Sequence, residues 1–328
     1  MRAGHKPDYR MAARESGTVE VMGSNPPPPS HGRDYSGWTP QGGPAPEILP
    51  PAGHVPPPQQ AHYGIPPAPP PRRQRSRWAL APATHALVAI NCAVYLLMVL
   101  QGVSPFAPSS DALMRWGADN AGSVLVNGEW WRIVTAMFVH GGILHLGLNM
   151  WCLWNLGLLA EPLMGWFGVS AVFLLTGAAG NLLSTFFNWK NFAHNLPFVP
   201  MASQAFPAGV GASGAVFGIA GALIVLLKSP RLPVPPVELK KIRRSVIYFA
   251  AINLFIGLGI NVGASRTGVM IDNWAHIGGC ASGLLFAAPM VPRIGWPRKT
   301  FDFRLRVAVG LVTGILVLFG FFLTQLGR

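Results

Sequence analysis

The sequence predicts an all-α membrane protein, a polytopic bundle of seven transmembrane helices that follows a proline-rich N-terminal tail. Half of its 328 residues are hydrophobic and only 11% are charged, well under the roughly 25% usual in soluble globular proteins. Apolar runs long enough to cross about 30 Å of hydrocarbon recur after the tail. Only helices and closed barrels satisfy their backbone groups in lipid. The runs lack the alternation and the short length of barrel strands.

We expect one helix in each apolar run, with a long connection of about 102–134 between the first two. This connection carries three tryptophans, which favour the membrane–water boundary, so it is expected to lie in that interface. The seven runs are 81–101, 135–159, 165–187, 210–228, 245–262, 273–291 and 306–325.

Residues 1–77 differ in composition from the rest of the chain and hold more than half of its prolines. Such a segment buries too little apolar surface to offset its ordering entropy, so we expect a disordered cytoplasmic tail. A solvated tail is the favoured interpretation, and a ligand for domains that bind proline-rich motifs is the alternative. Residues 78–292 would then form the six-helix membrane domain, and residues 293–328 a basic linker and a seventh helix.

Lysine and arginine mark one side of the expected bundle. They cluster before the first span (72–77), after the fourth (228–244) and after the sixth (293–306). By the positive-inside rule the N-terminus is cytoplasmic and, with seven spans, the C-terminus is outside. The second, fourth and sixth spans therefore start at the outer side. We expect an integral protein of the bacterial inner (plasma) membrane.

The net charge of +13 does not indicate a nucleic-acid-binding protein, because the basic residues lie between apolar spans rather than in a stripe with exposed aromatics. The three cysteines, Cys92, Cys152 and Cys280, are odd in number and lack the spacing of metal ligands. They predict neither a disulfide framework nor a zinc site. We expect no metal and no cofactor.

Four polar residues fall near the outer ends of three expected helices: His145 and Asn149, Ser213, and His276. A polar group inside hydrocarbon is costly and suggests a functional site. A serine hydroxyl becomes a nucleophile when a neutral imidazole takes its proton. A helix N-terminus offers free N–H groups to an oxyanion, and His145 and Asn149, spaced i, i+4 on one helix face, could add donors. The combination indicates hydrolysis inside a membrane.

Small-residue patterns suggest how this site could assemble. Gly214–Gly218 and Gly279–Gly283 are both G-x-x-x-G segments, which let transmembrane backbones approach closely. If the fourth and sixth helices pack through them, Ser213 and His276 could come within hydrogen-bond reach. The one acidic residue near His276 is Asp272, a turn earlier in the expected outer loop, so a serine–histidine dyad is favoured over a triad.

These elements resemble the rhomboid family of intramembrane serine proteases, in the family's order over roughly residues 80–290. The elements are His140-x4-His145-x3-Asn149, Gly211-x-Ser213-Gly214, Ala275-His276-x2-Gly279-x3-Gly283, and Trp131-Arg132 of the first connection. The resemblance implies a rhomboid-like six-helix core, and the seventh span matches the variant with one helix added at the C-terminus (6+1).

The resemblance also implies roles. Ser213 would be the nucleophile and His276 the general base. His145, Asn149 and the Ser213 N–H would stabilise the oxyanion, while Arg132 and Glu161 match structural positions. We interpret His140 as lining the approach to the site or as structural, rather than chemical. The implied partners are membrane lipid and single-pass membrane proteins, cut in or near their spans after lateral access past the second and fifth helices.

Two rival functions remain. A transporter would place its polar residues near the midplane and repeat its halves, whereas this polar set lies in the outer half and no repeat is visible. A catalytically inactive rhomboid-like protein would bind transmembrane clients as a chaperone or adaptor. Such proteins lose the serine or histidine, or place a proline before the serine. Here Ala212 precedes Ser213 and both catalytic positions are intact, which favours an active enzyme.

Overall fold

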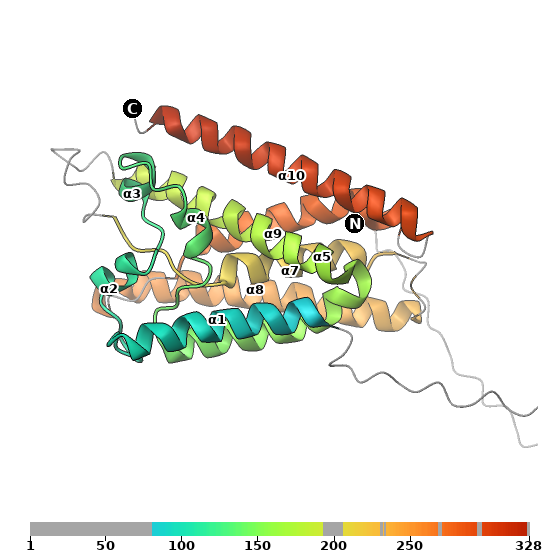
Figure 1. Cartoon of the computed structure of the whole chain (residues 1–328). Coiled ribbons are helices and arrows are strands. Elements are labelled where there is room, and N and C mark those ends of the chain that lie inside the picture. The colour runs from blue at the N-terminus through green and yellow to red at the C-terminus, as the bar shows by residue number, and fades with distance from the viewer. Residues whose placement is uncertain are drawn as a thin grey trace, which may run out of the picture. The chain divides into compact units, whose positions relative to one another are not determined.

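The computed structural model describes residues 81–192, 206–229, 232, 234–267, 271–293 and 297–326. All of these belong to one compact unit, Pro70–Arg328, and the predicted tail of residues 1–77 lies outside the described residues. The described part of the chain forms helices and no strand (Figure 1), which confirms the predicted polytopic helical bundle. The elements are α1 (Pro82–Leu100), α2 (Ser110–Arg115), α3 (Ala121–Leu125), α4 (Arg132–Thr135), α5 (Ile143–Phe192), α7 (Ser213–Leu226), α8 (Pro236–Thr267), α9 (Asn273–Ala287), the 3₁₀ turn η4 (Ala288–Arg293) and α10 (Arg298–Leu326).

The α5 segment covers two of the predicted spans. It is interrupted at Gly165, whose φ of 74° and ψ of 171° are not helical. The first arm of α5, before Gly165, packs against α1, where Gly157 approaches Thr84. The second arm, after Gly165, packs against α9, where Gly180 approaches the backbone of Ala275. The predicted boundary between the second and third spans therefore lies at this break.

Two predicted spans begin later than the sequence indicated. The second was expected from residue 135, but Gly142 has a φ of 130° and α5 begins only at Ile143. The fourth was expected over 210–228, but Gly211 has a φ of 114° and α7 is a 14-residue helix. At 1.5 Å per residue α7 is about 21 Å long, shorter than a hydrocarbon core of about 30 Å. In both cases a glycine in the left-handed region stops the helix.

Within the described residues, four helices are long and apolar enough to cross a membrane, and α7 is a shorter apolar helix. The four long apolar helices are Pro82–Leu100, Ile143–Asn191, Asn273–Val291 and Arg298–Leu326. The seven predicted runs correspond, in order, to α1, the two arms of α5, α7, α8, α9 and α10.

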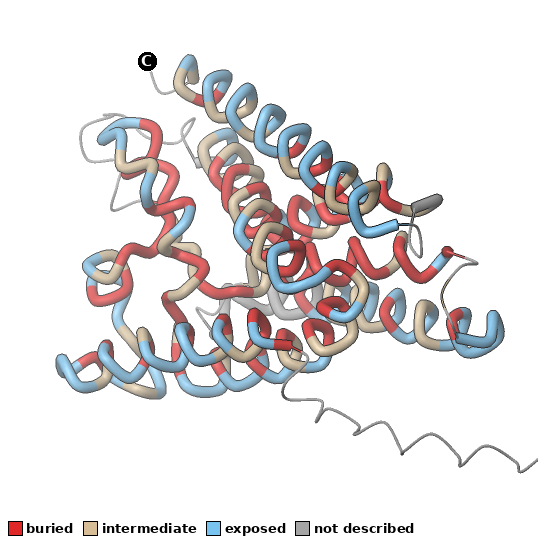
Figure 2. The backbone as a smooth tube through the Cα atoms, turned by 45° about the vertical axis from the view of Figure 1, so that its right-hand side comes forward, coloured by how far each residue is buried: buried red, intermediate tan, exposed pale blue. Residues whose placement is uncertain are grey.

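Helix α7 forms the core of the bundle. Nearly all of its residues are buried, and it contacts α5, α8 and α9. Its alanines and glycines keep it thin enough for neighbours to approach closely. By contrast, α10 packs along the outside on α3, α5 and α9, and much of its surface is exposed (Figure 2). This arrangement surrounds the start of α7 with the helices that carry the other predicted site residues.

Candidate active site

Ser213 is the first residue of α7, and hydrogen bonds hold the turn before it. The Gly211 N–H donates to Ala136 O at 2.9 Å, and the Ala212 N–H donates to His140 Nε2 at 3.5 Å. Ser213 itself is half-buried. The two N–H groups before Ser213 therefore have partners, whereas among the described residues no hydrogen bond engages the Ser213 N–H.

Helices α7 and α9 touch backbone to backbone through their glycines. A Cβ on Gly279 would lie 2.0 Å from Gly214 O, and a Cβ on Gly283 would lie 2.0 Å from Gly218 O. Both distances are far inside van der Waals contact, so only glycine fits at these two positions of α9. The predicted packing of the two G-x-x-x-G segments is confirmed.

This contact brings His276 to the face of α7 that begins with Ser213. The His276 ring stacks on Phe217 with 4.2 Å between ring centroids and 10° between ring planes. Because Phe217 follows Ser213 by four residues, both lie on one face of α7. His276 is only 7% exposed, and its Nδ1 is buried without a hydrogen-bond partner. In the described part of the chain, no hydrogen bond joins the side chains of Ser213 and His276.

His145 and Asn149, from the first arm of α5, face the turn before Ser213. A Cβ on Gly211 would lie 2.8 Å from His145 Nε2 and 3.7 Å from Asn149 Nδ2. His145 Nδ1 accepts the Gly141 N–H at 3.3 Å, so the neutral ring carries its proton on Nε2. Asn149 Nδ2 also donates to His145 O at 2.9 Å. Two side-chain donors thus lie beside the turn that precedes Ser213.

His140 is a residue whose position the sequence could not specify. It is fully buried, so it does not line an open approach to the site. Its Nδ1 lies 3.3 Å from Phe138 O and donates to it, since a carbonyl only accepts, and its Nε2 accepts from Ala212. The His140 and His145 rings are 5.3 Å apart between centroids. The structural interpretation of His140 is the one that fits these contacts.

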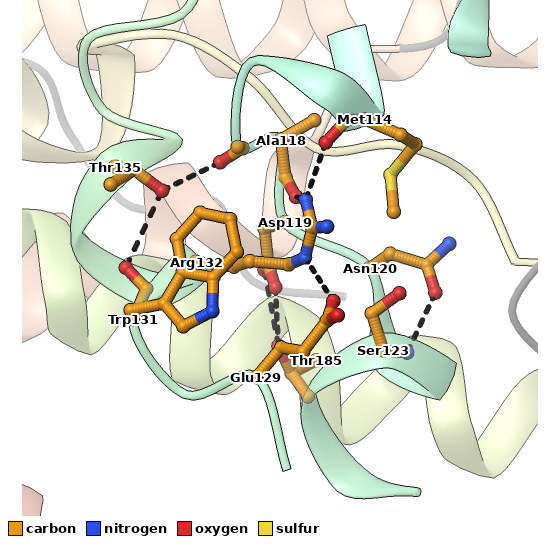
Figure 3. A network of polar contacts seen from close by, with 11 residues as sticks. Met114, Ala118, Asp119, Asn120, Ser123, Glu129, Trp131, Arg132, Thr135 and Thr185 are labelled. Atoms are coloured by element: carbon orange, nitrogen blue, oxygen red, sulfur yellow. Dashed lines mark hydrogen bonds and ion pairs between the residues drawn. The ribbon is translucent and has the colours of Figure 1, made fainter. Parts of the chain in front are cut away.

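Two carboxyl groups, that of the buried Asp119 and that of the half-buried Asp272, lie behind the site. Asp272 caps α9, because its Oδ1 accepts the Ala275 N–H at 3.0 Å and its Oδ2 accepts the Ser184 hydroxyl. Asp119, in the first connection, accepts the Thr185 hydroxyl at 3.1 Å (Figure 3). Burial raises the pKa of Asp119 to about 7, and repulsion from Asp272 adds to the rise, against the opposing effect of the Thr185 hydrogen bond. Nothing in the sequence distinguished Asp119 from an ordinary loop acid.

Arg132 organises the first connection rather than the chemistry. Its Nη1 donates to Met114 O at 2.7 Å and to Ala118 O at 3.0 Å, and its Nε pairs with Glu129 at 2.5 Å (Figure 3). Its guanidinium also lies 4.5 Å from the centre of the Trp131 ring. These contacts fit the structural position that the resemblance implied.

Glu161 has a comparable role at the other end of the first arm of α5. Its carboxylate accepts the N–H groups of Ala83 and Thr84 at 2.8 Å each, and the Thr84 hydroxyl at 2.7 Å. A buried anion at a helix N-terminus satisfies unpaired N–H groups and complements the helix dipole. Glu161 therefore fastens α1 to α5.

The described residues contain no group of three or more His, Cys, Asp or Glu side chains that could hold a metal ion. The three cysteines are free. The chemistry available at this end of the bundle is that of a serine, three histidines, an asparagine and helix N-terminal N–H groups.

Comparison with known proteins relates this arrangement to a family. Rhomboid protease GluP of Bacillus subtilis (strain 168) is 30% identical over 230 residues, which cover 70% of this chain and 38% of that protein. RHOMBOID-like protein 6, mitochondrial, of Arabidopsis thaliana is 33% identical over 198 residues, 59% of this chain and 55% of that protein. Rhomboid protease AarA of Providencia stuartii is 29% identical over 209 residues, 62% of this chain and 70% of that protein.

The chain thus matches less than two thirds of the length of the first two of these relatives. A model of the Rhomboid domain matches residues 127–293, about half of the chain. That region contains the two arms of α5, the glycine contact of α7 with α9, and all four predicted site residues. The protein is therefore an integral membrane protein that belongs to the rhomboid family.

Proposed function

We propose that the protein is an intramembrane serine endopeptidase in which Ser213 is the nucleophile and His276 the general base. The observation that carries this proposal is the glycine contact of α7 with α9, which sets the His276 ring over the Ser213 face of α7. A neutral imidazole there accepts the Ser213 proton as Oγ attacks the scissile carbonyl carbon. It then returns the proton to the leaving amine.

The oxyanion of the tetrahedral intermediate is held by the Ser213 N–H, His145 and Asn149. Support comes from the hydrogen bonds of the preceding turn, where the Gly211 and Ala212 N–H groups already have partners. Among the described residues, the next N–H along the chain, that of Ser213, has no partner and is available to an oxyanion. His145 Nε2–H and Asn149 Nδ2 lie beside the same turn. Fixed donors of this kind stabilise developing charge without reorganising during the reaction.

The proposed substrates are single-pass membrane proteins cut in or near their spans, at small residues followed by helix-weakening residues. A substrate helix must unwind to present a carbonyl, because its own backbone bonds otherwise occupy that group. Lateral access is supported by a cavity of about 210 Å³ between the first arm of α5 and α8. Trp151 and Leu156 line it from α5, and Ile242 and Phe249 line it from α8.

The test is cleavage of a model transmembrane substrate by the full chain in detergent. Ser213→Ala and His276→Ala are expected to abolish cleavage while leaving the thermal unfolding midpoint close to that of the wild type. Ser282→Ala is the matched control, because the bonds of this hydroxyl among the described residues run back to the Gly278 and Gly279 carbonyls of its own helix. Full cleavage by Ser213→Ala would contradict the dyad.

The alternative candidate is an inactive rhomboid-like protein that binds transmembrane clients. It is favoured by the missing hydrogen bond between Ser213 and His276 among the described residues. A fluorophosphonate probe separates the two candidates, since it labels a serine only when a base activates it. Labelling that disappears in Ser213→Ala and in His276→Ala supports the enzyme. Absent labelling, with a transmembrane client still captured, supports the binder.

We further propose that the membrane is a bacterial inner membrane, with the N-terminus in the cytoplasm and the C-terminus and active site on the outer side. The proposal rests on the lysines and arginines that cluster at one side of the bundle. A reporter enzyme that is active only outside the cytoplasm should be active when fused after residue 328. Activity of the same reporter at the N-terminus instead would reverse the orientation.

A further inference from the structure

The segment that leads to Ser213 and the start of the His276 helix meet beside two carboxyl groups. Asp119 pairs with Gly209 through two backbone hydrogen bonds of 2.8 and 2.7 Å. A Cβ on Gly209 would lie 3.5 Å from Asp119 Cβ and 3.7 Å from Asp272 Oδ2. Gly209 precedes Ser213 by four residues, and Asp272 precedes His276 by four residues. One small region therefore contacts both segments that carry the proposed dyad.

Two consecutive hydroxyls of α5 bind these carboxyl groups. Ser184 donates to Asp272 Oδ2, and Thr185 donates to Asp119 Oδ2 at 3.1 Å (Figure 3). Asn188 Nδ2 donates to Ser184 Oγ at 3.1 Å, so the Ser184 proton is free to bond with Asp272. The second arm of α5 is thereby the common support of both acids.

The charges that face Asp119 do not neutralise it fully. Asp272 repels it, and Arg132 attracts it more weakly, because the Arg132 guanidinium is occupied by Glu129 and by backbone carbonyls. Asp272 faces Ser184, the N–H groups at the start of α9, and Asp119. Burial raises the pKa of both acids, that of Asp119 to about 7. Because like charges oppose each other's ionisation, the negative charge of Asp272 adds to the rise in the pKa of Asp119.

We propose that Asp119 and Asp272 are positioning residues that form a protonation-dependent anchor between the Ser213 segment and the start of α9. While the pair retains a proton, it holds Gly209 beside the N-terminus of α9. When both acids are ionised, their repulsion separates the two segments and displaces Ser213 from His276. The catalytic consequence rests on the proposed function, whereas the structural one does not. Asp119 lies outside the matched Rhomboid domain of residues 127–293.

The stability of the folded protein should report this anchor. Asp119 has a folded-state pKa of about 7 against an ordinary value of 3.8, so the folded protein binds its proton more tightly than the unfolded chain does. This raised pKa stabilises the folded protein. The stabilisation is fully present when the pH is below the ordinary pKa of 3.8, and it is lost as the pH rises towards the folded-state pKa of about 7. An ordinary exposed acid gives no such dependence.

The experiment measures the thermal unfolding midpoint of the full chain in detergent from about pH 5 to about pH 8. The wild-type midpoint is expected to fall by several degrees. Asp119→Asn and Asp272→Asn keep polar side chains at their positions but cannot ionise, so the fall should shrink in both. Asp111→Asn is the matched control, because Asp111 is an exposed acid of the same connection, and it should keep the wild-type fall.

A second variant keeps Asp119 and changes the pH at which it ionises. The Thr185 hydrogen bond lowers the pKa of Asp119, so Thr185→Val should shift the fall in midpoint to higher pH. This variant decides the question if Asp119→Asn does not fold. An unchanged pH dependence in Thr185→Val, or in both asparagine variants, would overturn the anchor.

The positioning claim has its own readouts. Hydrogen exchange of residues 206–213, corrected for the intrinsic effect of pH, should rise above about pH 7 in the wild type and not in Asp119→Asn. The turnover number of the wild type should also fall above about pH 7, while KM changes little. Variants that lack Asp119 or Asp272 should not show this fall. Exchange that follows the wild type in Asp119→Asn would overturn the positioning role. If no protein cleaves substrate, the proposed function fails, while the midpoint and exchange measurements still decide the anchor.

Discussion

At the residue level, the proposed oxyanion site depends on which hydrogen-bonding groups already have partners. The Gly141 N–H occupies His145 Nδ1 and so directs the ring proton to Nε2. Ala136 and His140 occupy the two N–H groups before Ser213. The sequence predicted which side chains would gather here, but tautomers and the use of individual N–H groups follow from contacts between segments distant in the chain.

Asn149→Ala should reduce turnover without eliminating it. Removal of one oxyanion donor typically costs about 10²–10³ in turnover number, and the loss should appear in kcat more than in KM. Asn91→Ala is the matched control, since Asn91 lies in α1 and bonds back to Leu87 O at 2.8 Å, as Asn149 bonds to His145 O at 2.9 Å. Equal effects of the two substitutions would argue against an oxyanion role for Asn149.

At the element level, the contact of α7 with α9 and the break in α5 decide the architecture. The G-x-x-x-G spacing predicted the first correctly, because small residues at i and i+4 form a flat strip on any helix. The late starts of α5 and α7 were missed, since the left-handed conformations of Gly142 and Gly211 depend on tertiary contacts. A Cβ on Gly142 would lie 2.7 Å from Phe106 O in the first connection, a contact that no local pattern reveals.

Gly279→Ala should separate α7 from α9. Its Cβ would have to displace the backbone of Gly214, and overpacking that shifts backbone typically costs about 1–3 kcal/mol. We expect a lower thermal unfolding midpoint and loss of turnover. Gly314→Ala in α10 is the control, because a Cβ there meets no atom within 4 Å. A Gly279→Ala protein with wild-type midpoint and turnover would show that the contact is not tight.

Glu161→Ala should weaken the attachment of α1 to α5. It leaves the buried donors of Ala83 and Thr84 without an acceptor, at about 1–3 kcal/mol for each unsatisfied group. The free energy of unfolding in denaturant should fall accordingly. Glu238→Ala removes an exposed carboxylate that pairs with Lys241, and such pairs contribute about 0–1 kcal/mol. A loss no greater than that of the control would place the anchoring of α1 elsewhere.

At the level of the whole molecule, α10 supports the bundle from outside the site. Its Leu323 is fully buried against Leu125 and Leu182 in a cluster that also includes Trp130 of the first connection. This cluster includes Ile133, which follows Arg132 in α4, so α10 packs against the segment that Arg132 organises. Helix α10, which corresponds to the seventh predicted span, therefore stabilises the first connection by packing against it.

A protein that ends at Arg293 should retain turnover but unfold at a lower temperature. Truncation exposes the apolar surface under α10 without altering the glycine contact of α7 with α9. The unfolding midpoint in detergent and the cleavage rate, measured on the same preparation, check this. Complete loss of turnover at a temperature where the truncated protein is folded would give α10 a direct part in the site.

The sequence by itself determined the helical membrane class, the order of the apolar runs and the four residues that converge at one end of the bundle. These depend on local composition and spacing, which the bilayer constrains strongly. Only the tertiary structure decided where α5 and α7 begin, that His276 stacks on Phe217, and that Asp119 and Asp272 meet beside Gly209. Each of these is a contact between segments far apart in the chain, set by backbone close approach and by the partners left for buried polar groups.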